Sequence, residues 1–154
     1  GIEIEQDTFK ELFKLSNTAI VKESSGSMQK LTEVLIDAPE SVSVFCGCDN
    51  LAFESFADGA VGWISMLANV APRDCVDLFE SVYDRKDLTH GFEVYKKILP
   101  ALNVLESFPK PVQALKYALK SKDLGGGYVR RPRLELSEDE KAFVDAQMHL
   151  ESLK

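Results

Sequence analysis

The stretch TAIVKESSG, residues 18–26, places a lysine directly after a short apolar run. Residues 19–21 predict a buried strand, and a helical pattern begins after Gly26. Loss of hydrating water at the end of such a strand disfavours a charged ammonium and favours the neutral amine. A neutral amine can attack a carbonyl group and form a Schiff base. Taken alone, however, Lys22 is better explained as a side chain that extends to the rim or pairs with Glu23.

Working outward from Lys22, the first half of the chain alternates helices with apolar strands. The pattern predicts strands over 19–22, 42–46 and 60–65, and helices over 8–14, 27–36 and 51–56. Thr8 and Glu11 have the spacing of a capping box for the first helix. Helices between apolar strands indicate an α/β fold built from β-α-β units, with a parallel sheet and right-handed crossovers.

The second half of the chain has a different pattern, without a strong strand from Pro72 onward. Pro72 suits the first position of a long helix that runs to about residue 82. A break over 84–88 precedes further helices around 92–99, 112–119 and 139–150, and Ser137 and Glu140 form a capping box for the last. We therefore divide the chain into a β/α part, residues 1–71, and a helical part, residues 72–154.

Composition excludes several classes of protein. The 154 residues are 45% hydrophobic, enough for one globular domain with a real core, and the net charge of −7 argues against a nucleic-acid surface. No apolar run approaches the length of a membrane span. The three cysteines, Cys46, Cys48 and Cys75, show no disulfide framework, which indicates reduced thiols and a cytoplasmic setting. A zinc site usually needs a second ligand pair, so we expect no metal.

The predicted sheet is incomplete by itself. Three parallel strands leave two open edges, and both faces of a parallel sheet need cover. A closed β/α barrel needs eight strands and typically about 250 residues. The chain therefore forms either a small open sheet or the C-terminal part of a larger fold.

Four stretches in the same order decide between these alternatives. They are IVKESSG (20–26), FCGCD (45–49), GAVGWISMLANVAP (59–72), and KPVQALK (110–116) with VRRPRL (129–134). Together they resemble the pyruvate-dependent aldolase family of dihydrodipicolinate synthase and N-acetylneuraminate lyase. In this resemblance Lys22 corresponds to the Schiff-base lysine. The match in order and spacing raises that interpretation of Lys22 well above a structural one.

The resemblance implies a fold as well. It identifies the three strands as strands 6–8 of a TIM barrel, followed by a C-terminal helical region. The chain begins at Gly1 without a starting Met, and we expect it to be a C-terminal fragment or one piece of a cleaved polypeptide. A complementing N-terminal part would close the barrel. The family also forms homo-oligomers, so we expect a dimer or tetramer.

The resemblance further implies a set of site residues. Lys22 would attack the ketone of pyruvate or another 2-oxo acid, while backbone groups near Gly47 and Ile64 would help to hold it. A glycine also lets a ligand approach the main chain, although a strand-ending turn explains Gly47 equally well. Asp49 would contact the distal part of the substrate or, with even weight, cap a helix. Trp63 is expected to pack on the outer face of its strand.

These expectations lead to one main function and three alternatives. The main one is a Schiff-base lyase of the dihydrodipicolinate synthase type that uses no metal and no organic cofactor. A 2-keto-3-deoxy sugar-acid aldolase or dehydratase uses the same chemistry. Asn50 stands where the sialic-acid lyases of the family carry an acidic residue, which disfavours that substrate. A non-catalytic relative and a complete small α/β binding module are the other readings. The family's proton relay lies on earlier strands, so we expect the isolated chain to be inactive.

Overall fold

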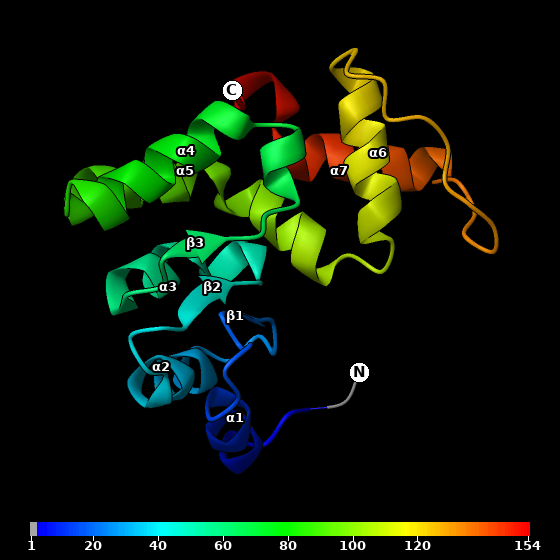
Figure 1. Ribbon diagram of the computed structural model, residues 1–154. Coiled ribbons are helices and arrows are strands. Elements are labelled where there is room, and N and C mark those ends of the chain that lie inside the picture. The colour runs from blue at the N-terminus through cyan, green and yellow to red at the C-terminus, as the bar shows by residue number, and fades with distance from the viewer. Residues whose placement is uncertain (1–2) are drawn as a thin grey trace.

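Three short parallel strands lie at the centre of the fold (Figure 1). The computed structural model describes residues 3–154. The strands are β1 (Ile20–Glu23), β2 (Ser43–Cys46) and β3 (Gly62–Trp63), in the order β1-β2-β3. Lys22 lies opposite Phe45, and Phe45 lies opposite Gly62. Because side chains alternate along a strand, this row shares one face of the sheet, which we call the inner face because the sequence predicts that it lines a barrel.

Helices separate the strands, as the alternating pattern predicts. They are α1 (Gln6–Phe13), α2 (Met28–Asp37), the 3₁₀ turn η1 (Asp49–Leu51) and α3 (Ala52–Asp58). The Ser27 side chain caps α2 by accepting the N–H of Lys30. Phe9, Val34 and Val44 form a small core where α1 and α2 pack against the outer face of β2. The predicted β-α-β arrangement is therefore confirmed.

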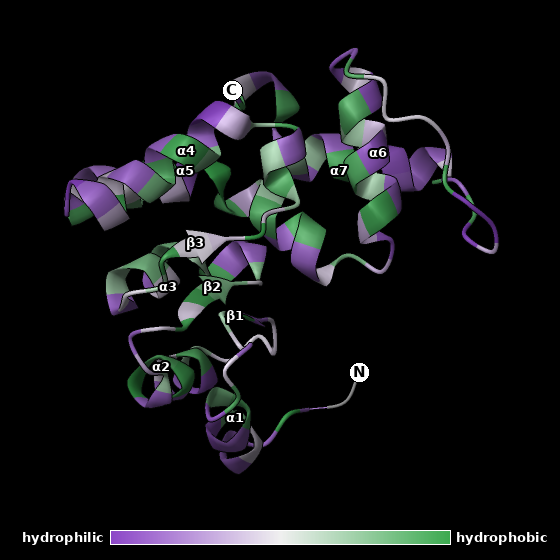
Figure 2. Cartoon of the chain, viewed as in Figure 1, coloured by the Kyte–Doolittle hydropathy of each residue, from purple (hydrophilic) through white to green (hydrophobic). Residues whose placement is uncertain are grey.

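The rest of the chain is helical and lies on the β3 side of the sheet, away from α1 (Figure 1). The elements are η2 (Leu67–Asn69), α4 (Pro72–Phe79), the π-helical turn η3 (Glu80–Asp84), α5 (Leu88–Ser107), α6 (Pro111–Ser121), α7 (Glu138–Met148) and η4 (Leu150–Ser152). Figure 2 shows apolar bands along α5 and α6. Ile98, Leu102 and Leu105 of α5 are fully buried in a core that extends from Ala52 to Leu153.

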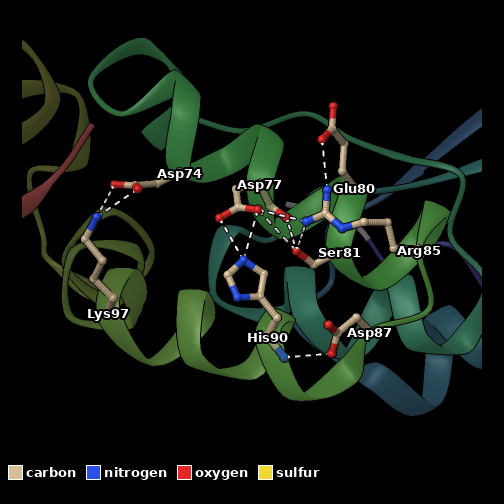
Figure 3. A network of polar contacts seen from close by, with 8 residues as sticks. All are labelled: Asp74, Asp77, Glu80, Ser81, Arg85, Asp87, His90 and Lys97. Carbon is tan, nitrogen blue, oxygen red and sulfur yellow. Dashed lines mark hydrogen bonds and ion pairs between the residues drawn. The ribbon is translucent and has the colours of Figure 1, made fainter.

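A polar network joins α4 to α5 outside this core (Figure 3). The Asp77 carboxylate contacts His90 Nε2 at 3.1 Å and Arg85 Nη2 at 2.9 Å. Asp74 pairs with Lys97 Nζ at 2.8 Å further along the same two helices. These contacts join α4 to the start and the middle of α5 on either side of η3.

The structure corrects several predicted boundaries. The Thr8 capping box is wrong, because α1 begins two residues earlier and Glu5 at its N-terminus makes no side-chain cap. The Ser137 capping box is confirmed. The predicted strand over 60–65 shortens to Gly62–Trp63, because the chain bends away to form η2. The predicted helix over 72–82 is regular only to Phe79 and continues as the π turn. Within residues 3–154, no helix combines the length and apolarity that crossing a membrane requires.

Candidate functional site

Lys22, Gly47 and Ile64 lie at the carboxyl ends of three adjacent strands. The N–H of Gly47 donates to the Glu23 carbonyl at 2.7 Å, and the N–H of Ile64 donates to the Cys46 carbonyl at 3.0 Å. These two bonds continue the parallel ladder just beyond β2 and β3. The structure thus brings three of the four predicted site positions to one edge of the sheet, where β/α barrels carry their active sites.

Lys22 projects from an open inner face. Ile20 and Ile64 on that face are 63% and 54% exposed, and Lys22 is exposed as well. The expectation that Lys22 loses its hydrating water is therefore wrong for these three strands alone. The lysine lines a hollow of about 480 Å³, together with Ser24, Ser25, Ser27, Lys30 and residues of the N-terminal segment.

Gly47 lies at a position where the surrounding atoms leave no room for a side chain. A Cβ at Gly47 would lie 2.6 Å from the Glu23 carbonyl oxygen and 2.8 Å from Cε of Lys22, and it would also overlap Ser24 Oγ. Real Cβ atoms essentially never approach other atoms below 3.0 Å. The absence of a side chain at Gly47 therefore lets the Lys22 side chain lie against the end of β2.

Asp49 is buried, with 1% of its surface exposed. Its carboxylate accepts the N–H groups of Met66, at 3.0 and 3.1 Å, and of Leu67, at 3.0 Å. Burial raises the pKa of Asp49 to about 6, although the hydrogen bonds from Leu67 and Met66 lower it. The carboxylate is turned toward the loop after β3. Asp49 therefore does not cap the helix that follows it, because neither η1 nor α3 has a side-chain cap at its N-terminus. It binds instead the backbone N–H groups at the start of η2, and its contact with substrate stays a prediction.

The other residues singled out from the sequence are structural. Trp63 lies on the outer face, as predicted, and its ring packs against Phe56 of α3 at 6.2 Å between centroids. The three cysteines are buried and free, as predicted. Burial raises the pKa of Cys48 to about 11 and that of Cys75 to about 12, so both thiols stay protonated at neutral pH.

Sequence reasoning missed Glu106, which lies near the end of α5. Its carboxylate accepts the backbone N–H of Asp49 across 57 positions of sequence. No local pattern signals such a contact, because the two residues are 57 positions apart and both lie outside the elements predicted from the sequence. In the part of the chain that the structure describes, no three His, Cys, Asp or Glu residues group in a way suited to a metal ion.

Comparison with known proteins agrees with this geometry. Residues 1–150 match the Dihydrodipicolinate synthetase family. The 4-hydroxy-tetrahydrodipicolinate synthase of Chloroherpeton thalassium is 37% identical over 151 residues, covering 96% of this chain and 49% of that protein. The enzyme of the same name from Methanothrix thermoacetophila is 30% identical, covering 92% of this chain and 48% of the relative. The chain thus spans about half the length of the curated relatives it matches.

Solved structures extend the agreement to the fold. Dihydrodipicolinate synthase from Aquifex aeolicus superposes with a TM-score of 0.86 at 28% identity, over 98% of this chain and 51% of that one. The small parallel sheet and the helices after it are the C-terminal part of a TIM barrel and its C-terminal helical region, as predicted. The division at residue 72 stays a prediction. On the match over residues 1–150, this chain belongs to the dihydrodipicolinate synthetase family.

Proposed function

We propose that this chain carries the Schiff-base lysine of an aldolase-type lyase that uses pyruvate or another 2-oxo acid. The observation that carries the proposal is the placement of Lys22. Its side chain leaves the carboxyl end of β1 on the inner face and lies against Gly47, where no side chain blocks the approach of a ligand. Membership of the family supports an aldolase-type lyase, and a similar solved structure, the dihydrodipicolinate synthase of Acinetobacter baumannii, is a complex with pyruvate.

The chemistry requires an amine that reaches a ketone. Nζ of Lys22 adds to the ketone carbon, and loss of water leaves an iminium ion. The iminium withdraws electrons, so the methyl carbon loses a proton and an enamine forms. The enamine carbon adds to an aldehyde, or the reverse step breaks the corresponding carbon-carbon bond. Hydrolysis then releases the product and restores the lysine.

The strand ends would orient the 2-oxo acid beside Lys22. Gly47 leaves its backbone accessible, and Ile64 lies at the end of the next strand, beside Gly47. Neither residue supplies an acid or a base. The groups that move protons would come from a complementing N-terminal part that supplies the earlier strands. The isolated chain would accordingly be inactive.

The exposed apolar surface supports the need for such a partner. Ile20 and Ile64 on the inner face are more than half exposed, and Val61 beside β3 is 37% exposed. Open strand edges and apolar faces invite association. A complementing N-terminal part would cover them, and a homodimer or homotetramer of completed barrels would form the working enzyme. The free thiols suit a cytoplasmic setting.

Exchange of the pyruvate methyl protons with deuterated water tests this function without knowledge of the second substrate. The chain assembled with its N-terminal complement should catalyse the exchange, because the enamine forms and reverts in the absence of an aldehyde. Lys22→Arg should abolish it, since a guanidinium keeps the charge but forms no Schiff base. Lys14→Ala, at the exposed residue that follows α1, should leave it unchanged. An assembled barrel that folds but catalyses no exchange would favour the non-catalytic reading.

A further inference from the structure

Two carboxylates, outside the set that contacts the proposed substrate, link the helical region to the mouth of the barrel. Asp49 follows Gly47 by two residues, and Met66 follows Ile64 by two residues. The carboxylate of Asp49 accepts the N–H groups of Met66 and Leu67 at about 3.0 Å, so it ties the loop after β2 to the loop after β3. Any shift of Asp49 must therefore move both loops.

The second carboxylate fixes Asp49 from α5. Glu106 accepts the backbone N–H of Asp49. Two further contacts from the same helix hold the next residue, Asn50: Tyr95 donates its hydroxyl to the Asn50 carbonyl at 2.6 Å, and Asn103 accepts from the Asn50 side chain at 3.1 Å. Residues 95, 103 and 106 recur at helical spacing, so the contacts to Asp49 and Asn50 come from one face of α5.

Packing alone does not explain this arrangement. A buried carboxylate without a paired cation is unfavourable, and Glu106 brings a second negative charge close to Asp49. An apolar contact would hold α5 against η1 at lower cost. Unlike an apolar contact, a hydrogen bond is directional. Hydrogen bonds from particular N–H groups to the carboxylates therefore hold the loops at a defined position relative to the strands.

We propose that Asp49 and Glu106 act as positioning residues that set the strand-end segments at Gly47 and Ile64 relative to Lys22. The inference rests on the proposed function, since those segments are the ones expected to hold the 2-oxo acid. It replaces the expected substrate contact of Asp49 with an indirect role and assigns a role to Glu106. Because these segments are expected to bind the 2-oxo acid, their misplacement should weaken binding more than it slows the attack by Lys22.

The test measures pyruvate affinity through the borohydride-trapped adduct on Lys22, in the chain assembled with its N-terminal complement. Asp49→Asn and Glu106→Ala should each raise the pyruvate concentration for half-maximal trapping about tenfold, equivalent to about 1.4 kcal/mol. The maximal trapping rate should change less. The loss of binding free energy in the double variant should be smaller than the sum of the losses in the two single variants, because both residues act on the same loop. Glu93→Ala, on the exposed side of α5, is the matched control and should match wild type.

Hydrogen exchange separates positioning from a general loss of stability. The amides of Met66 and Leu67 should exchange faster in Asp49→Asn while the amides of β1 stay protected. Unchanged pyruvate affinity in both folded variants would overturn the positioning role and leave the proposed function intact. Wild-type protein that forms no adduct would overturn the proposed function and the positioning role with it.

Discussion

Replacing Gly47 with alanine should separate Lys22 from its substrate by a small and calculable movement. The added Cβ would lie 2.6 Å from the Glu23 carbonyl oxygen, whereas an ordinary contact begins at 3.4 Å. The end of β2 must therefore shift by about 0.8 Å relative to β1. The Glu23 carbonyl cannot simply turn aside, because it accepts the N–H of Gly47 at 2.7 Å. The same Cβ pushes against Cε of Lys22, at 2.8 Å.

This movement should affect both the stability of the fold and the rate of trapping. Overpacking in a well-packed region costs typically about 1–3 kcal/mol, so the melting temperature of Gly47→Ala should fall moderately. A reacting group displaced by close to 1 Å loses about 100-fold in rate, so trapping of pyruvate on Lys22 should fall by about that factor. A 100-fold loss of rate corresponds to about 2.7 kcal/mol, which is similar to the expected loss of stability, so the trapping rate must be measured on folded protein.

A double variant tells the backbone contact apart from the side-chain contact. Ser24→Ala removes the hydroxyl that the new Cβ would overlap but leaves the Glu23 carbonyl in place. Ser24→Ala with Gly47→Ala should recover part of the stability and little of the trapping rate. The assays are thermal unfolding and borohydride trapping at saturating pyruvate in the assembled barrel. If folded Gly47→Ala traps pyruvate at the wild-type rate, the geometry proposed for Lys22 and Gly47 is refuted.

Three further variants test other parts of the structure. Gly62→Ala would place a Cβ 2.6 Å from Cδ1 of Phe45, so thermal unfolding should show a loss of about 1–3 kcal/mol; an unchanged melting temperature would contradict this register. Burial raises the pKa of Asp49 to about 6 from 3.8, so the folded protein binds more protons between these values. The stability of wild type relative to Asp49→Asn should therefore fall by up to about 3 kcal/mol as the pH increases from about 4 to 7. A relative stability that increases over this pH range would contradict the raised pKa. Ser137→Ala, which removes the cap of α7, should cost about 1 kcal/mol in urea unfolding, and no cost would exclude the capping box.

The sequence predicts the elements whose information is local. Apolar runs at 19–22 and 42–46 predict β1 and β2 within one residue at each end, and Ser137 with Glu140 predicts the start of α7. Four motifs in order supply the barrel register, which periodicity alone could not. The location of Lys22 and Gly47 at neighbouring strand ends follows from that register.

The features that the sequence does not predict depend on contacts between distant segments. β3 is shorter than its apolar run because Asp49 draws the following loop into η2. The role of Glu106 depends on how α5 packs against η1, which no local spacing encodes. The exposure of Lys22 differs from the prediction for a similar reason. The apolar run predicts a buried strand, but α1 and α2 cover only the outer face of the sheet, and the sequence pattern does not indicate what covers the inner face.

Trapping of the Schiff base tests the central claim most directly. The chain assembled with its N-terminal complement is incubated with pyruvate and borohydride, digested, and mapped by mass spectrometry. The account predicts one reduced pyruvyl group on the peptide that contains Lys22 and none on that peptide in Lys22→Arg. A folded, assembled protein with no adduct, or with its adduct on another lysine, would contradict the account.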